Sequence, residues 1–353
     1  MIQNMIRESP IRVGINGFGR IGRAVLRISE DNPLIEVVGI NDIDPMIENH
    51  AYLLKYDSTY GRFNGHVEKC DASSLKVNDR GVRFFNEEKI DDVPWEDLAC
   101  DVIIDASGVA ENLVSSKNLV DANRVKKIVV THSPKIGVDS TIIFGVNDHE
   151  FDSTRHHIVS SSICDANACA PVLAALERKF GIASGFITTL HPWLSYQNLV
   201  DGSVRSVSNP GHLWPDMSLG RASTTSLIPK NTSLGCALER VLPEVAPRLQ
   251  SISFRIPTGI VSAADLTLTL NQEVTVEDVH GLYKECEKNY PNVVTLSTDE
   301  LVSVDFSGER HSVNIDSRWT RVNRGVELKT IIWYDNEWAY SCRVVDTALL
   351  VTK

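Results

Sequence analysis

The sequence predicts an α/β fold in which an open, largely parallel sheet is followed by an α+β region with a mainly antiparallel sheet. Up to about residue 163, short apolar runs rich in β-branched residues alternate with helical connections and a glycine-rich turn. After residue 164, longer runs alternate apolar with polar residues, which is typical of strands with one buried face.

The bulk composition is that of a globular protein with two domains of ordinary size. The chain has 353 residues, of which 42% are hydrophobic and 23% are charged. Its formal net charge of −11 argues against a nucleic-acid or anionic-membrane partner. No apolar run is long enough to span a membrane, and the first residues lack the apolar core of a signal peptide. The cysteines contain no CxxC pair, so no metal site is expected and a reduced cytoplasm is favoured.

The first half of the chain reads as strands joined by helices. "IRVGI" at 11–15 predicts a strand, "RAVLRISEDN" a helix after a glycine cluster, and "IEVVGIND" the next strand. A strand, a helix and a second strand in this order predict a parallel pair. The further strand candidates are residues 82–85, 101–107, 127–133 and 141–146.

The second half begins with a helix and continues with longer strands. "DANACAPVLAALERKFG" predicts that helix, and "AYSCRVVDTALLVTK" predicts an amphipathic C-terminal helix. Residues 202–220 are rich in Gly, Ser and Pro, and we expect them to form a long ordered loop. We therefore expect one domain over 11–163, completed by a helix over 337–353, and a second domain over 164–336. The strands expected in the second domain are residues 183–192, 252–270, 301–306 and 326–338.

A GxGxxG motif lies between the first strand and the first helix. Asp42 follows the last of its glycines by 20 residues, at the end of the second strand. This context predicts a Rossmann dinucleotide-binding site, in which the helix N-terminus binds the pyrophosphate and Asp42 accepts hydrogen bonds from the ribose. A 2′-phosphate would meet the charge of Asp42, so NAD is favoured over NADP. The motif residues are Gly17, Phe18, Gly19, Arg20, Ile21 and Gly22.

Cys164 is a candidate nucleophile. Taken alone it would more often be a buried structural cysteine, but it heads a predicted helix, where the dipole lowers a thiol pKa. A nearby imidazole would lower that pKa further and serve as base and then acid. A thiolate can add to an aldehyde, and loss of hydride then leaves a thioester. Cys169, on the same helix, is expected to face the core.

Six motifs resemble the phosphorylating glyceraldehyde-3-phosphate dehydrogenase family, from about Arg12 to the end of the chain. The closely related erythrose-4-phosphate dehydrogenases are similar as well. The motifs occur in the family's order and near its spacing. They are "VGINGFGRIGR", "LLKYDSTYGRF", "CDANACAP", "TTLHPW", "FRIPT" and "WYDNEWAYS".

The resemblance implies roles for individual positions. Cys164 falls at the family's nucleophile and His191 at the histidine that activates it. Asn336 resembles the residue that holds the nicotinamide carboxamide, and Tyr340 lies near it. The resemblance also implies a homotetramer acting on a small-molecule aldehyde. The remaining residues expected at the site are Ser107 for the cofactor, and Arg255, Thr232, Arg221 and Asp165 for the substrate.

The chain departs from the family's pattern at both phosphate-binding places. The family's Ser-Cys-Thr-Thr-Asn segment reads Ile163-Cys164-Asp165-Ala166-Asn167 here, so two hydroxyls become an isoleucine and a carboxylate. Two unit charges about 4 Å apart repel by about 4 kcal/mol at an effective dielectric near 20, which disfavours inorganic phosphate. Beyond His191, Leu194 and Tyr196 replace the threonines that hold the substrate's phosphate, and the loop between Asp201 and Arg221 is longer.

Three interpretations remain open from the sequence. In the first, the chain is an NAD(P)-dependent aldehyde dehydrogenase for a small, anionic aldehyde, and water releases the acid from a thioester. In the second, it is a phosphorylating glyceraldehyde-3-phosphate dehydrogenase in which Asp165 points away from the site. In the third, it is a weakly catalytic NAD-binding regulator. NADP also stays open, because Ser203 replaces a residue that is often proline in NAD-specific members.

Overall fold

The computed structural model describes residues 9–203 and 216–353. His212 and Trp214, in the predicted loop 202–220, lie outside the described residues. Two compact units are present, and each is described by itself. The first unit comprises Met1–Ile142, Glu150–Ser162 and Ser341–Lys353, and the second Ile143–His149 and Ile163–Tyr340.

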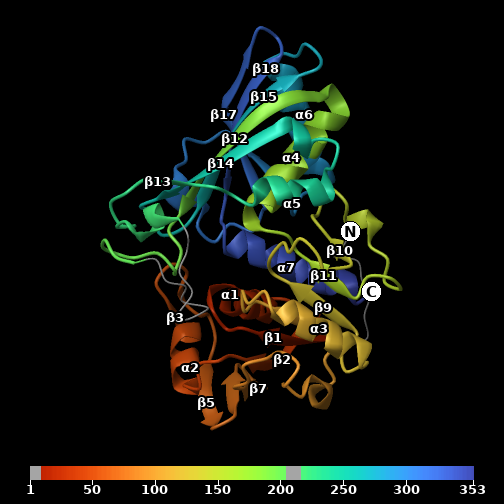
Figure 1. Ribbon diagram of the computed structural model, residues 1–353, viewed down its shortest axis with the longest axis vertical. Helices are drawn as coiled ribbons and strands as arrows, with labels where there is room; N and C mark the ends of the chain where they lie inside the picture. Colours follow the sequence, from red (N-terminus) through yellow and green to blue (C-terminus); the bar gives the residue numbers. More distant parts are fainter. Residues whose placement is uncertain (1–8, 204–215) are drawn as a thin grey trace. The chain divides into compact units, whose positions relative to one another are not determined.

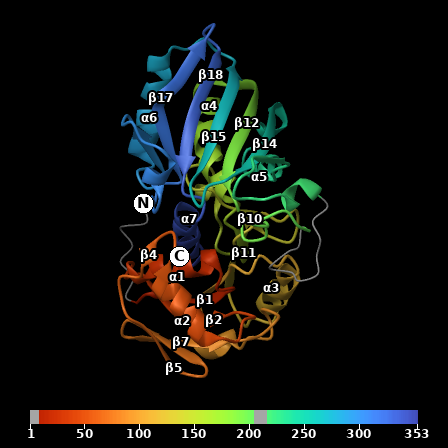
Figure 2. The same ribbon diagram turned by 90° about the vertical axis from the view of Figure 1, so that its left-hand side faces the viewer.

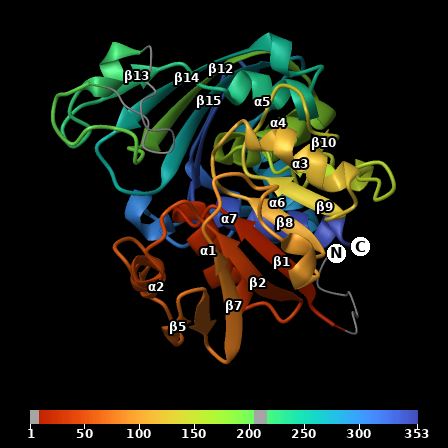
Figure 3. The same ribbon diagram turned by 60° about the horizontal axis from the view of Figure 1, so that its bottom comes forward.

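The first unit is built on a nine-stranded sheet in the order β10-β11-β9-β8-β1-β2-β7-β6-β5. Strands β7, β2, β1, β8 and β9 run side by side and parallel (Figure 3). The unit contains β1 (Ile11–Asn16), α1 (Arg20–Glu30), β2 (Ile35–Asn41), α2 (Ile47–Lys55), β3 (Tyr56–Asp57), β4 (Gly61–Arg62), β5 (Val67–Asp71), β6 (Ser74–Val77), β7 (Arg80–Phe85), β8 (Val102–Asp105), α3 (Asn112–Asp121), β9 (Lys127–Val130), β10 (Ser140–Thr141), β11 (Ile158–Ser160) and most of α7 (Trp338–Val351).

The central strands of this sheet are buried on both faces. Every residue of β8 and β9 is buried, as the continuous β-branched runs of these strands predict. Trp95, Ile103 and Ile128 belong to one apolar cluster against this part of the sheet. The prediction of an α/β first half is therefore confirmed.

The second unit is built on a seven-stranded sheet in the order β13-β14-β12-β15-β18-β17-β16 (Figure 1). Four of its six strand pairs are antiparallel, so the predicted mainly antiparallel sheet is present. The unit contains α4 (Cys164–Phe180), β12 (Ile182–Pro192), β13 (Ile228–Lys230), α5 (Leu234–Val241), β14 (Leu249–Ile256), β15 (Ser262–Leu270), α6 (Val276–Asn289), β16 (Val294–Ser297), β17 (Val313–Asn323) and β18 (Glu327–Tyr334).

Helices α4, α5 and α6 pack on one face of this sheet (Figure 2). Side chains alternate across a strand, so every second residue of a strand points to that face. In β12 the odd-numbered residues from Gly185 to His191 are buried, whereas Phe186 and Leu190 are exposed. The alternation therefore puts His191 on the helix-covered face.

Three strand predictions need correction. The strand predicted for 141–146 ends at Thr141, and residues 144–147 form turns, because Gly145 has a φ of 81° and the Ile143 N–H donates to the Asn147 side chain at 2.9 Å. Residues 303–306 form a 3₁₀ turn, closed by the Val302 N–H on the Asp305 carboxylate at 2.8 Å. The run 252–270 is two strands, separated by a segment in which Val261 has a φ of 70°.

Among the described residues, no helix is both long and apolar enough to cross a membrane. All seven cysteines are free.

Candidate active site

Cys164 is the first residue of α4, as the sequence predicts. The residue before it, Ile163, is extended, and Ser162 has a φ of 59° in the left-handed region that non-glycine residues seldom adopt. Such strain concentrates at functional sites and is sustained by the surrounding structure. Asp165, in the first turn of the helix, is stabilised by the helix dipole.

Strand register brings the other side chains to the same face of the sheet. His191 on β12 and Arg255 on β14 are neighbours across a parallel pair. Arg255 in turn pairs with Ile228 on β13, so Lys230, two residues along β13, points to the same face. Tyr334 ends β18 and is buried with every second residue of that strand. The ends of four strands and the start of α4 therefore supply the side chains of the site.

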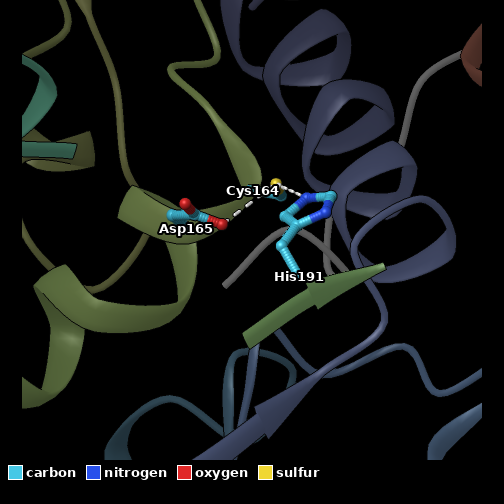
Figure 4. Close-up of side chains that lie close together, drawn as sticks. All are labelled: Cys164, Asp165 and His191. Carbon is cyan, nitrogen blue, oxygen red and sulfur yellow. Dashed lines mark hydrogen bonds between the residues drawn. The ribbon is translucent and has the colours of Figure 1, made fainter. Parts of the chain in front are cut away.

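The sulfur of Cys164 lies between a carboxylate and an imidazole (Figure 4). Its Sγ is 3.5 Å from Oδ1 of Asp165 and 3.7 Å from Nε2 of His191. The thiol has one proton and two potential acceptors for it. Asp165 points toward the nucleophile, whereas the second interpretation of the sequence requires it to point away from the site.

Tyr334 fixes the position of Asp165. Its hydroxyl donates to Oδ1 of Asp165 at 2.8 Å, and both side chains are buried. Burial, and then the negative charge of Asp165, raise the pKa of Tyr334 well above its ordinary value, so this hydroxyl remains a donor. The sequence reasoning missed Tyr334. The alternation of β18, which puts Leu328, Thr330 and Ile332 on the buried face, could have found it.

The expectation of a lowered Cys164 pKa is wrong. Burial and the adjacent Asp165 charge raise the pKa of the thiol well above its ordinary value, while Arg255 opposes them in part. His191 supplies no imidazolium charge, because burial and Arg255 lower its pKa to about 4. Cys164 is therefore a protonated thiol at neutral pH.

His191 is oriented to act as a base. Its Nδ1 lies 2.8 Å from the carbonyl oxygen of Pro192, and a carbonyl only accepts, so Nδ1 carries the proton. The lone pair of the neutral ring is then on Nε2, which faces the sulfur of Cys164.

Arg255 is a buried cation with unused donors. It is 8% exposed, and its Nε has no hydrogen-bond partner among the described residues. Its Nη2 donates to the hydroxyl of Tyr196 at 3.4 Å. Lys230 acts on His191 as a second positive charge. The sequence reasoning missed Lys230, although the antiparallel pairing of β13 with β14 aligns it with this face. An anion would satisfy these groups.

Tyr196, which replaces one of the family's threonines, contacts both the loop region and Arg255. Its ring packs against Leu219 and Ile228, and its hydroxyl accepts from Arg255. Leu194 instead closes a turn, since its N–H donates to the Gln197 side chain at 2.9 Å.

The other two predicted substrate residues have local hydrogen-bond partners in the structure. Oγ1 of Thr232 accepts from the N–H of Leu234 at 3.2 Å, just before α5. Arg221 is at the surface, where its Nε donates to Asp201 at 3.1 Å. The structure does not bring Arg221 into contact with the nucleophile, the base or Arg255 among the described residues.

The two residues predicted for the nicotinamide lie in the second unit. Asn336 is buried, and its Oδ1 has no hydrogen-bond partner among the described residues. A carboxamide NH₂ group would satisfy this acceptor. Tyr340 is also buried, and burial and the nearby Cys164 raise its pKa well above the ordinary value. Cys169 is fully buried in the core, as predicted.

The glycine-rich turn belongs to the first unit. Gly17 has a φ of 88°, and a Cβ there would lie 2.5 Å from the backbone of Ser107. A Cβ on Gly22 would lie 2.2 Å from the Gly17 carbonyl oxygen, so helix and turn pack closely. A Cβ on Gly19 would meet open space. Gly19 is also the N-cap of α1 and has no side chain to cap it. This geometry fits a dinucleotide pyrophosphate.

Asp42 and Arg20 are both engaged near this turn. The Phe18 N–H donates to Oδ2 of Asp42 at 2.6 Å, and a carboxylate retains further lone pairs for ribose hydroxyls. Arg20 forms an ion pair with Asp57. Ser107 donates to Asp105 at 2.7 Å, so its hydroxyl orders the loop beside Gly17.

Two family models match the chain. Residues 11–113 match "Glyceraldehyde 3-phosphate dehydrogenase, NAD binding domain" and residues 163–336 match "Glyceraldehyde 3-phosphate dehydrogenase, C-terminal domain". The fold and these matches define an NAD-dependent oxidoreductase that acts on an aldehyde. The chain belongs to the glyceraldehyde-3-phosphate dehydrogenase family, and the resemblance seen in the sequence is confirmed. NAD is its cofactor.

Proposed function

We propose that the protein oxidises a small, anionic aldehyde with NAD through a thioester on Cys164, and that water, not inorganic phosphate, releases the acid. The observation that carries this proposal is the Asp165 carboxylate, 3.5 Å from the nucleophilic sulfur and held there by Tyr334. A carboxylate in this position repels a phosphate dianion and accepts a hydrogen bond from water.

His191 starts the reaction as a base. Its neutral Nε2, 3.7 Å from Sγ, takes the thiol proton as sulfur adds to the aldehyde carbon. Because the pKa of the resting thiol is raised, this transfer accompanies attack and does not precede it. NAD, when bound, accepts the hydride that oxidation removes from the aldehyde carbon. The Cys164 sulfur then carries the acyl group, and the His191 imidazolium, whose pKa is lowered to about 4, gives the thiol proton to solvent, so that Nε2 is neutral again.

Hydrolysis uses the same base and adds a role for Asp165. Water attacks the thioester carbon, its proton passes to Nε2 of His191, and the carbon–sulfur bond breaks. The electron pair leaves with sulfur, and the thiolate is then reprotonated, so one water yields the free acid and the thiol. Asp165 orients the water by accepting a hydrogen bond from its second O–H group. The hydrogen bond from the Tyr334 hydroxyl to Asp165 holds the carboxylate in position for this role.

Charge disfavours the phosphate-dependent alternative. A phosphate at the thioester would lie about 4 Å from Asp165, and each unit of charge costs about 4 kcal/mol at an effective dielectric near 20. Ile163 offers no hydroxyl in compensation. Water carries no charge and does not meet this repulsion.

The substrate's anion is assigned to Arg255. This guanidinium is buried and has an unpaired Nε, and Lys230 adds a second positive charge beside His191. Thr232 and Arg221 are proposed as weaker or loop-dependent contributors. A hydroxyaldehyde carrying a phosphate or carboxylate meets these requirements.

We propose cofactor roles for residues of the first unit and, separately, for residues of the second. The turn from Gly17 to Gly22 and Asp42 would hold the pyrophosphate and adenosine ribose, and Ser107 would support the turn. The unpaired Oδ1 of Asn336, with Tyr340 near it, suits the nicotinamide carboxamide. Residues 11–163 and 337–353 are accordingly proposed as the NAD-binding domain and 164–336 as the catalytic domain.

We also propose a homotetramer in the cytoplasm. Phe186, Leu190 and Ile252 are exposed on neighbouring strands β12 and β14, which supports an apolar subunit interface. The free cysteines support a reducing compartment. Light scattering of the purified chain tests the tetramer.

The proposed function is tested by NADH formation from glyceraldehyde-3-phosphate and erythrose-4-phosphate, with and without inorganic phosphate. We expect turnover that is indifferent to phosphate and lost in Cys164→Ser. Turnover that requires phosphate would make the chain a phosphorylating member. NAD binding without turnover of these or other aldehydes would favour a regulator.

A further inference from the structure

The side chains of Cys164, Asp165 and His191 also form a set of metal ligands that their sequence spacing does not reveal. Their ligand atoms all lie within 4.8 Å of one another. The Sγ–Oδ1 distance is 3.5 Å and the Sγ–Nε2 distance is 3.7 Å. In tetrahedral zinc sites with Zn–S near 2.3 Å and Zn–N or Zn–O near 2.0 Å, sulfur lies about 3.5 Å from its neighbouring ligands. The Sγ–Oδ1 edge already has this length, and the Sγ–Nε2 edge, at 3.7 Å, is slightly longer.

Two of the three ligands, His191 and Asp165, have the hydrogen-bond partners that hold metal ligands in place. A zinc-binding histidine usually donates its other ring N–H to a carbonyl or carboxylate. Nδ1 of His191 donates to the Pro192 carbonyl at 2.8 Å and leaves Nε2 for the metal. Ligating carboxylates are in turn hydrogen-bonded, and Tyr334 donates to Asp165 at 2.8 Å.

We propose that Cys164, Asp165 and His191 bind one zinc ion, which occupies the nucleophile and reversibly inhibits the enzyme. The zinc–sulfur bond forms as the thiol proton passes to solvent. The thiolate and the carboxylate contribute one negative charge each, so the complex of the dication with a neutral imidazole carries no net charge. Three protein ligands leave a fourth position for water.

The donor set selects zinc over the common hard cations. Sulfur and imidazole nitrogen suit zinc, whereas magnesium and calcium take oxygen ligands. The positive charge of Arg255 near Cys164 and His191 disfavours a free cation. The charge of Arg255 has little effect on a neutral complex. Zinc binding therefore requires both negative charges, from the Cys164 thiolate and from Asp165. The inference goes beyond the proposed function, because it concerns the resting site and not the way in which the thioester is released.

The test is a cobalt titration of the metal-free full-length chain, without aldehyde or NAD. We expect one ion per chain, with a thiolate-to-cobalt charge-transfer band and the visible bands of tetrahedral cobalt, and displacement of both by zinc. Cys164→Ser should lose the charge-transfer band, and Asp165→Asn should weaken binding by at least about tenfold. Cys236→Ser is the matched control, because that thiol is exposed on α5, and it should bind like the wild type.

A second readout uses only the wild-type chain. Zinc should slow the alkylation of Cys164 by iodoacetamide and leave that of Cys236 unchanged, EDTA should restore it, and magnesium should have no effect. Absence of the charge-transfer band, equal binding by Asp165→Asn, or unprotected Cys164 would overturn the proposal. Because none of these readouts involves turnover, their failure is distinct from failure of the proposed function.

Discussion

Asp165→Asn should make Cys164 a more reactive thiol. The substitution is nearly isosteric, and Tyr334 can still donate to the amide oxygen, so the local structure is retained. It removes a negative charge 3.5 Å from the sulfur, which is one of the two main causes of the raised Cys164 pKa. Burial, the larger cause, remains. The pKa of the thiol should therefore fall.

The size of the effect follows from the separation of the charges. Two unit charges about 3.5 Å apart repel by about 5 kcal/mol at an effective dielectric near 20, which is an upper bound. Cys164 is partly exposed, so solvent screening reduces the difference to about 1–2 kcal/mol. The thiolate fraction at pH 7 should then rise roughly 5- to 30-fold.

The assay is the rate of iodoacetamide alkylation between pH 6 and 9, read on the Cys164 peptide by mass spectrometry. Cys236 in the same chain is an internal reference, because it is exposed and belongs to α5. We expect the Cys164 rate at pH 7 to rise in Asp165→Asn while the Cys236 rate stays constant. An unchanged or slower rate at Cys164 would refute the assigned electrostatic role of Asp165.

Four other perturbations test separate parts of the site. Burial lowers the pKa of His191 from 6.5 to about 4, so between these pH values the unfolded chain binds a proton that the folded chain does not. The wild type should therefore lose about 3 kcal/mol of unfolding free energy as the pH falls from 6.5 through 4. In urea titrations, His191→Gln should lose less over the same range. Tyr334→Phe leaves Asp165 without its buried donor and should cost about 1–3 kcal/mol in the same assay. Arg255→Ala should lower kcat/KM for a phosphorylated aldehyde about 10- to 100-fold, through loss of charged hydrogen bonds, and should lower kcat/KM for a neutral aldehyde less. Gly19→Ala adds a methyl group in open space, so it should keep thermal stability but raise the KM for NAD at least about tenfold.

Each of these expectations has a contrary result. The pH dependence of stability would be the same in His191→Gln if another group caused it. Full stability of Tyr334→Phe would mean that water replaces the hydroxyl. An equal loss for neutral and anionic aldehydes in Arg255→Ala would point to a structural role. Unfolding of Gly19→Ala would mean that the space at this turn is not open.

Most of the fold that could be predicted follows from strand alternation and from the spacing of the glycines. The parallel first sheet and α4 follow directly from apolar periodicity. Residues 142–146 did not, because a buried apolar run has no period that distinguishes a strand from turns. In this run the Asn147 side chain and the positive φ of Gly145 close turns. Helix α6 was missed although Thr275 and Asp278 form a capping box before it, which is a readable signal.

The reacting residues could be named from motifs, but their electrostatics could not. The sequence places Asp165 after Cys164 without saying which way the carboxylate points. That direction is decided by Tyr334, 169 residues away, whose position depends on the register of β18. The sign of the Cys164 pKa shift depends on the same contact and on burial, so helix position alone predicts it wrongly.

Release of the thioester by water is tested most directly by single-turnover decay of the acyl-enzyme on Cys164 at increasing inorganic phosphate. The aldehyde and NAD are mixed with excess enzyme, and the thioester is trapped by acid at timed intervals. We expect a decay rate that does not change with phosphate and a free acid as product, because Asp165 keeps phosphate from the thioester. A rate that rises with phosphate and yields an acyl phosphate would contradict this expectation.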